Sequence, residues 1–251
     1  MTFNLSFVTN LLPPLCYKWA FLFIFNKLHE PHYFSNKKRK MTPKEKRNER
    51  LAAKLIANLE RRHFEAYYCH TADEIINKVK EIIPEGSSIS WGGSMSIRDT
   101  GLTQALKSGP YKVYDRDDVT TEADKRAIYL KAFDVDFYLA SANALSEDGV
   151  IVSIDGNGNR VAAITWGPRR VIFVVGLNKV AQDVNAALQR ARGIASPINA
   201  ARFDIETPCQ ADGMCHNCKS PQSICNYVHF LRNSHPAKRH IVILTDLDLG
   251  Y

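Results

Sequence analysis

The stretch RVIFVVGLNK (Arg170–Lys179) decides the fold. The part from Arg170 to Gly176 is almost wholly apolar, which is typical of a strand that is buried on both faces of a sheet. A helical pattern follows it, from about Lys179 to Arg192. A strand with a helix directly behind it predicts a parallel α/β sheet, because crossover helices cover the faces of such a sheet.

The same alternation of strand and helix extends through most of the chain. Further strands are expected at His63–Cys69, Ser87–Trp91, Tyr111–Tyr114, Val135–Ser141 and His240–Thr245, and further helices at Thr42–Arg62, Thr71–Ile83, Ser96–Lys107 and Thr120–Phe133. The segments VIVSI and RVAAI flank DGNGN (Asp155–Asn159), and such a turn between apolar segments is a strong signal for a β-hairpin. The prediction is therefore an α/β fold with a mixed, mainly parallel sheet and helices on both faces.

The N-terminal segment 1–40 differs in composition from the rest. Its apolar run Leu15–Phe25 has eleven residues, whereas a membrane-spanning helix needs about 20. Directly after Met41, Thr42 begins a capping box that predicts the start of a helix. We interpret 1–40 as an extension upstream of a start at Met41, outside the fold, and 41–251 as the domain. A membrane-associating tail is the alternative.

The distribution of charge argues against a nucleic-acid partner. The formal net charge is +7, but eight Lys or Arg and only two Glu lie between Lys37 and Arg50. Residues 51–251 carry 23 basic and 23 acidic residues, whereas a nucleic-acid-binding domain shows a basic face on the fold itself. No secretion signal is recognisable. We therefore expect a cytoplasmic protein that binds neither nucleic acid nor a membrane.

The glycine turn WGGSMS (Trp91–Ser96) is a candidate site for an anion. Gly92 and Gly93 allow backbone N–H groups to approach a ligand, and Ser94 and Ser96 add hydroxyl groups at the start of a predicted helix. In open α/β sheets, ligands bind where strands pass into helices. The alternative is a tight turn with a serine cap, and the spacing matches neither a dinucleotide motif nor a P-loop.

Two other polar turns follow apolar strands. Asn143 and Glu147 come after the predicted strand Val135–Ser141, and Asn178 and Lys179 come after the stretch that opens this section. Lys179 has the charge to neutralise a phosphate or a carboxylate. Alternatively, Asn178 caps a helix and Lys179 points into water. Because three polar turns leave three apolar strands, we expect them to converge on one pocket for a small anionic metabolite.

A cysteine-rich segment at residues 207–226 carries the strongest sign of a metal. Four cysteines follow the spacing C-x5-C-x2-C-x6-C: Cys209, Cys215, Cys218 and Cys225. Structural disulfides are rare in a reducing compartment, so a thiolate site is the better interpretation. Zinc sites usually use two tight pairs of ligands, and only one such pair is present. Iron–sulfur clusters accept more varied spacing, so a [4Fe–4S] cluster is favoured and zinc is the alternative.

The motifs WGGSMSIRDTG, ALSEDGVIVSIDGNGNRVAAITWGP, VIFVVGLNK and the cysteine segment together resemble the LUD domain, the lactate-utilization domain of LutC-like and LutB-like proteins. The resemblance covers roughly Thr42–Tyr251. It implies a fold similar to NagB, ribose-phosphate isomerase and CoA-transferases. It also implies a role in oxidation of L-lactate to pyruvate beside iron–sulfur redox subunits. The chain departs from the LutB pattern because it lacks paired ferredoxin-type cysteine runs, and from a minimal LutC-like chain because it carries four cysteines of its own.

The resemblance also suggests a catalytic carboxylate. In CoA-transferases of this fold the nucleophile is a glutamate in a similar turn, and SEDG (Ser146–Gly149) places Glu147 at that position; a solvated turn is the alternative. Three functions stay open. They are a protein of lactate or related organic-acid oxidation with an iron–sulfur site, a CoA- or phosphosugar-handling enzyme with structural zinc, and a non-catalytic binding subunit. Whether the chain is an enzyme, and whether it forms a homo-oligomer, is left open by the sequence.

Overall fold

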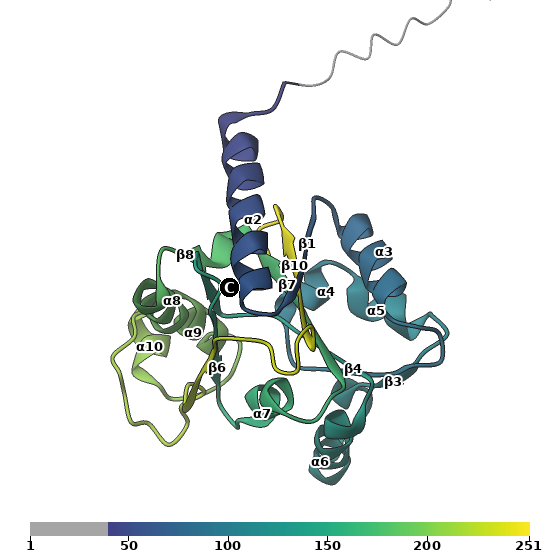
Figure 1. The fold of residues 1–251 in the computed structure, drawn as a ribbon. Coiled ribbons are helices and arrows are strands. Elements are labelled where there is room, and N and C mark those ends of the chain that lie inside the picture. Colours follow the sequence, from purple (N-terminus) through teal and green to yellow (C-terminus); the bar gives the residue numbers. More distant parts are fainter. Residues whose placement is uncertain (1–39) are drawn as a thin grey trace, which may run out of the picture. The chain divides into compact units, whose positions relative to one another are not determined.

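The stretch Arg170–Gly176 forms strand β7 in the middle of a six-stranded sheet in the computed structural model (Figure 1). The structure describes residues 40–251. Residues Thr42–Tyr251 form one compact unit. The predictions for residues 1–39 lie outside the described residues.

Every strand pair in the main sheet is parallel, which confirms the α/β prediction. In spatial order the strands are β1 (Glu65–Cys69), β10 (His240–Thr245), β7, β4 (Phe137–Ala140), β2 (Ser88–Trp91) and β3 (Lys112–Tyr114). The last strand in the sequence thus lies between β1 and β7.

Side chains of β7 alternate between two hydrophobic cores. Val171, Phe173 and Val175 belong to the core on one face, and Ile172 and Val174 to the core on the other. All five are fully buried, and each contributes roughly 1.5–3 kcal/mol by leaving water. This two-sided burial is the physical reason for the unbroken apolar run in the sequence.

Helices cover both faces, as predicted (Figure 1). Apolar side chains of α2 (Pro43–Arg61) and α7 (Asn159–Thr165) pack into the first core, and those of α3 (Ala72–Ile82), α4 (Met95–Asp99) and α5 (Leu102–Lys107) into the second, while α6 (Glu122–Lys131) lies outside both. The cap expected at Thr42 is present and Thr71 caps α3 in the same way, since their hydroxyl oxygens accept hydrogen bonds from the backbone N–H groups of Glu45 and Glu74. Each cap is worth about 1 kcal/mol.

A second sheet of four strands supplies the antiparallel pairs. Its order is β8 (Val180–Ala181), β5 (Ala144–Ser146), β6 (Ile151–Asp155) and β9 (Tyr227–Leu231). Strand β6 is antiparallel to both β5 and β9, and β5 is parallel to β8. The sequence did not predict β9, and its pairing with β6 places the cysteine segment beside this second sheet.

The predicted hairpin around Asp155–Asn159 is wrong. Its first arm is β6, but its second arm is helix α7. Gly158 has φ +80°, which a glycine adopts without strain, and it begins the helix. The Asp155 carboxylate then accepts hydrogen bonds from the backbone N–H groups of Arg160 and Val161. These two bonds satisfy donors of the first helical turn, so the segment is stable as a helix.

Two predicted helices have different bounds from those expected. The segment Ser96–Lys107 forms two short helices, because Gly101 with φ +72° interrupts it. The helix expected from Lys179 begins only at Val184, where the Asp183 carboxylate caps it. It runs as α8 (Val184–Arg190), a π-helical turn (Ala191–Ala195) and α9 (Ser196–Ala200), and the short α10 (Pro208–Asp212) follows. Between residues 40 and 251, no helix is both long and apolar enough to cross a membrane.

Candidate functional site: a cationic pocket beside four cysteines

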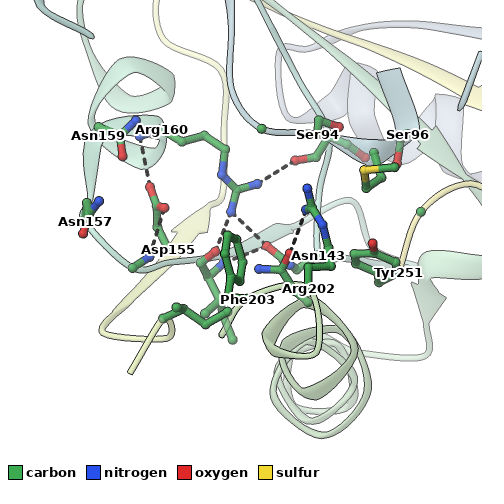
Figure 2. A pocket seen from close by; sticks show the side chains of 18 of the residues that line it. Ser94, Ser96, Asn143, Asp155, Asn157, Asn159, Arg160, Arg202, Phe203 and Tyr251 are labelled. Carbon is green, nitrogen blue, oxygen red and sulfur yellow. Dashed lines mark hydrogen bonds between the residues drawn. The ribbon is translucent and has the colours of Figure 1, made fainter. Parts of the chain in front are cut away.

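A cavity of about 560 Å³ is lined by residues that follow β2, β4 and β7 (Figure 2). Of the residues predicted for an anion site, Gly93, Ser94, Ser96, Asn143 and Lys179 line it. The carboxyl ends of parallel strands lie at one edge of a sheet, and this geometry brings the three polar turns together.

Lys179 is the most deeply buried charged group of the pocket, with 3% of its surface exposed. It ends a short 3₁₀ turn after β7 (Leu177–Lys179), so its side chain is directed inward instead of beginning a surface helix. The Nζ atom donates to Ser96 Oγ at 2.8 Å, to Ser141 Oγ at 3.2 Å and to the Ala142 carbonyl oxygen at 3.2 Å. Burial lowers the pKa of Lys179 from 10.5 to about 7.

Arg160 is a second central group, which sequence reasoning missed. Figure 2 shows its side chain extending from α7 into the pocket. The guanidinium donates to the Ser141 carbonyl oxygen at 3.2 Å, to Asn143 Oδ1 at 3.1 Å and to the Ile154 carbonyl oxygen at 2.5 Å. Arg160 was missed because a strand was expected at this position. Prediction of a helix capped by the Asp155 carboxylate would have placed Arg160 next to the polar turn that follows β6.

Positive charge in the pocket exceeds what its own carboxylates neutralise. Six basic side chains line it, namely Arg98, Arg116, Lys125, Arg160, Lys179 and Arg202, against three acidic ones, Asp117, Glu122 and Asp155. Asp117 pairs with Arg98 and Arg116, and Glu122 pairs with Lys125. Within the part of the chain that the structure describes, Arg160, Lys179 and Arg202 form no ion pair with an acidic side chain. The arrangement therefore favours an anionic ligand.

Ser94 offers the pocket a free hydroxyl group. Its Oγ is buried and has no hydrogen-bond partner among the described residues, and Figure 2 shows the side chain at the pocket. A buried hydroxyl without a partner is costly, so a ligand that accepts or donates a hydrogen bond there is favoured. The helix dipole expected behind this turn is weak, because α4 has only five residues.

The remaining predicted residues lie around the pocket or outside it. A Cβ atom on Gly92 would lie 3.0 Å from Arg160 Cδ, so the absent side chain makes room for this arginine. Asn178 does not line the pocket; its Oδ1 accepts from the backbone N–H of Leu249 at 3.4 Å, in the segment that leads to the lining residue Gly250. Glu147 is exposed on the turn after β5 and does not line the pocket, and its predicted catalytic role stays a prediction.

The four cysteines line a second, smaller cavity of about 60 Å³. Cys209 lies in α10, and the other three lie in the loop between α10 and β9. All four thiols are free. Thr207 Oγ1 lies 3.3 Å from Cys209 Sγ, and Ser223 Oγ lies 3.2 Å from Cys225 Sγ, so two of the sulfur atoms have hydroxyl partners.

The geometry of these thiols differs from that of a closed site for a single ion. Across residues 40–251, no group of three or more His, Cys, Asp or Glu side chains is arranged to hold one metal ion. The four cysteine residues nevertheless line one cavity, and Ser223 and Ile224 line both this cavity and the cationic pocket. The two cavities therefore share a wall that is one short loop thick.

Fold and site together define an α/β protein with a cationic pocket at the carboxyl edge of a parallel sheet and four cysteines beside it. Residues 52–245 match the family described as the LUD domain. The chain therefore belongs to the LUD domain family, which is associated with lactate utilization. No curated protein matches the chain.

Several solved structures are similar in fold. A DUF162 family protein from Deinococcus radiodurans has 11% identity and a TM-score of 0.48, over 79% of this chain and 97% of that one. The eIF2B beta structure from Chaetomium thermophilum has 12% identity and a TM-score of 0.34, over 45% and 44% of the two chains. Ribose 5-phosphate isomerase A from Neisseria gonorrhoeae has 15% identity and a TM-score of 0.30, over 45% and 56%. At these scores the similarities carry no weight for function.

Proposed function

We propose that this LUD domain protein binds a small organic anion in the cationic pocket and serves in the oxidation of L-lactate or a related 2-hydroxy acid, with an iron–sulfur cluster on its four cysteines. The observation that carries the proposal is that Ser223 and Ile224 line both the cavity with the four cysteines and the cationic pocket. Membership in a family associated with lactate utilization supports the choice of substrate.

The pocket suits a carboxylate. Arg160, Lys179 and Arg202 have no acidic ion-pair partner among residues 40–251, and Ser94 has an unused hydroxyl group. Hydrogen bonds between such cations and a carboxylate are roughly twice as strong as neutral ones. Arg160 is held by three carbonyl-type oxygen atoms, so its position is fixed before a ligand arrives and little entropy is lost on binding.

The number and spacing of the cysteines support the choice of a cluster. A [4Fe–4S] cluster is held by four thiolates, whereas structural zinc sites usually use two tight pairs of ligands, of which this segment has one. Cys209, Cys215, Cys218 and Cys225 would hold the cluster, and the hydroxyl groups of Thr207 and Ser223 would tune it by hydrogen bonds to sulfur. When bound, a cluster supplies a one-electron acceptor.

The metal assignment is tested by anaerobic purification and analysis of iron, sulfide and zinc. We expect a brown protein with absorbance near 400 nm (on the order of four irons per chain for a cubane cluster). Cys218→Ser should lose this absorbance. Cys69→Ala is the matched control, because Cys69 is a buried free thiol at the end of β1. Colourless protein with stoichiometric zinc would refute the cluster.

The ligand assignment is tested by thermal shift with L-lactate, pyruvate and sulfate. Stabilisation by a bound ligand grows with its concentration over Kd, and Arg160→Gln should remove most of it. Arg169→Gln is a suitable control, because Arg169 is exposed and lies outside the pocket. An equal ligand response in both variants would contradict the assignment of the pocket.

A second candidate function rests on the size of the pocket. A cavity of about 560 Å³ with four arginine side chains exceeds the needs of a three-carbon acid, and Arg is favoured where phosphate is bound. A phosphosugar is therefore the alternative ligand. Tighter binding of ribose 5-phosphate than of L-lactate, together with zinc in place of iron, would favour this alternative.

A further inference from the structure

Among residues 40–251, the hydrogen-bond partners of Lys179 are all neutral groups. Its Nζ lies within 3.2 Å of two serine hydroxyl groups, those of Ser96 and Ser141, and of the Ala142 carbonyl oxygen. A buried ammonium group is usually paired with a carboxylate, since the isolated charge is costly in a low-dielectric environment. Lys179 and its three partners Ser96, Ser141 and Ala142 all line the pocket.

The charges that surround Lys179 oppose its protonation. Burial lowers its pKa most, the guanidinium groups of Arg190 on α8 and Arg160 on α7 lower it further, and Asp99 at the end of α4 raises it. Arg190 is itself fixed by hydrogen bonds to the backbone oxygens of Asn178 and Asn143. Two fixed positive charges and burial therefore outweigh one exposed carboxylate.

The partners of Lys179 serve both of its protonation states. A serine hydroxyl accepts a hydrogen bond from an ammonium group and donates one to the lone pair of a neutral amine. When the proton leaves, the hydroxyl of Ser96 or Ser141 can change from acceptor to donor. The Ala142 carbonyl oxygen accepts a hydrogen bond in either state. A lysine that pairs with a carboxylate lacks this freedom, because the carboxylate is only an acceptor.

From this geometry we propose that the pocket binds its anion together with one proton, and that Lys179 is the group that takes up this proton. The inference rests on the anion pocket of the proposed function and adds the form in which the ligand is bound. The neutral amine of Lys179, the anion and one H⁺ combine into an ammonium–anion pair, so charge and atoms balance. The proton on Nζ then lies beside the ligand.

The pH range of the effect follows from the pKa of Lys179, which burial lowers to about 7. At pH 8 the amine of the empty pocket is about 90% neutral, and at pH 6 about 10%. Binding of an anion favours the ammonium form and raises the pKa. We therefore expect uptake of about 0.9 proton per anion at pH 8 and about 0.1 at pH 6, with affinity about tenfold weaker for each pH unit above 7.

Titration calorimetry with sulfate tests the proposal, because sulfate itself does not titrate between pH 6 and 9. Binding heats measured in buffers of different ionisation enthalpy give the number of protons taken up. The full-length protein should show strong dependence on the buffer at pH 8 and little at pH 6. Buffer-independent heats at pH 8, with clear binding of sulfate, would overturn the role of Lys179 and leave the anion pocket standing.

Two variants locate the proton. Lys179→Met should bind sulfate weakly and without uptake of a proton. Lys131→Met is the matched control, because Lys131 lies outside the pocket and pairs with Asp134, and it should keep the full uptake at pH 8. Uptake that persists in Lys179→Met would assign the proton to another group and refute the proposal. Absence of binding by both sulfate and L-lactate would remove the anion pocket, and this proposal with it.

Discussion

Replacement of Lys179 by methionine is expected to stabilise the protein at neutral pH. The folded-state pKa of Lys179 lies at about 7, below its ordinary value of 10.5. Between these values the unfolded chain binds more protons than the folded one, so the free energy of unfolding rises with pH in this range. Below pH 7 the full cost of the buried charge is present, and above pH 10.5 it is absent.

The magnitude follows from the pKa interval and the contacts of Nζ. A shift from 10.5 to about 7 corresponds to about 5 kcal/mol. Methionine removes this cost but also three hydrogen bonds, each worth about 1 kcal/mol. We expect Lys179→Met to be more stable by about 1–2 kcal/mol at pH 7. At pH 9.5 the remaining cost of the charge is only about 1.4 kcal/mol, so the lost hydrogen bonds dominate and the variant should be less stable.

Urea denaturation of both proteins at pH 7, 8 and 9.5, in buffers without phosphate or sulfate, measures the difference. A gain of 1 kcal/mol corresponds to about 2–4 °C in Tm for a domain of this size. The decisive result is a change of sign between pH 7 and 9.5. A variant that is less stable than the parent at pH 7, or a difference that does not depend on pH, would refute the reasoning.

Three further predictions concern the pocket, the core and a buried histidine. Gly92→Ala should displace the side chain of Arg160 and weaken binding of L-lactate by roughly tenfold, about 1.4 kcal/mol. Gly193→Ala should leave binding unchanged, because a Cβ atom at Gly193 meets open space. Equal affinities of the two variants would contradict the packing argument. Phe173→Ala should lower the free energy of unfolding by about 3–5 kcal/mol. Trp166→Ala should change it little, because the Trp166 side chain is 75% exposed. Similar urea midpoints for the two variants would be inconsistent with the burial of Phe173. Burial lowers the pKa of His240 from 6.5 to about 4, so the free energy of unfolding should fall by about 3 kcal/mol between pH 6.5 and 4. In denaturation measured at several pH values, His240→Gln should reduce this dependence of the unfolding free energy on pH. An unchanged dependence would assign the acid sensitivity to another group.

The main sheet was predictable because its strands are buried on both faces. A run such as Val171–Val175 has no polar alternation, and a helix cap marks the start of the element that follows several of these runs. The region after β6 was not predictable in the same way. Its sequence fits a hairpin turn, and the helix forms because the Asp155 carboxylate satisfies two backbone donors at the turn. Local propensity alone does not reveal that choice.

The candidate site was predictable to the extent that it depends on strand ends. Ser94, Asn143 and Lys179 follow three neighbouring strands, so sequence order alone places them at one edge. Arg160 was missed because its helix was taken for a strand. The sequence also did not predict that the cysteines lie close to the pocket, because this depends on the pairing of β9 with β6. The pairing brings the cysteine loop next to Gly156, whose carbonyl oxygen accepts a hydrogen bond from the Asn226 side chain.

The central position of β10 has a consequence for synthesis of the protein. Among the described strands of the main sheet, β1 pairs only with β10, which is made about 170 residues later. At roughly 5–20 residues per second this delay lasts on the order of ten to thirty seconds. Throughout that interval β1 lacks β10 as a neighbour, and the sheet against which the apolar face of α2 packs is incomplete. The nascent chain is therefore expected to depend on chaperones until β10 emerges from the ribosome, and a ribosome stalled before His240 should hold a chain that proteases cleave readily.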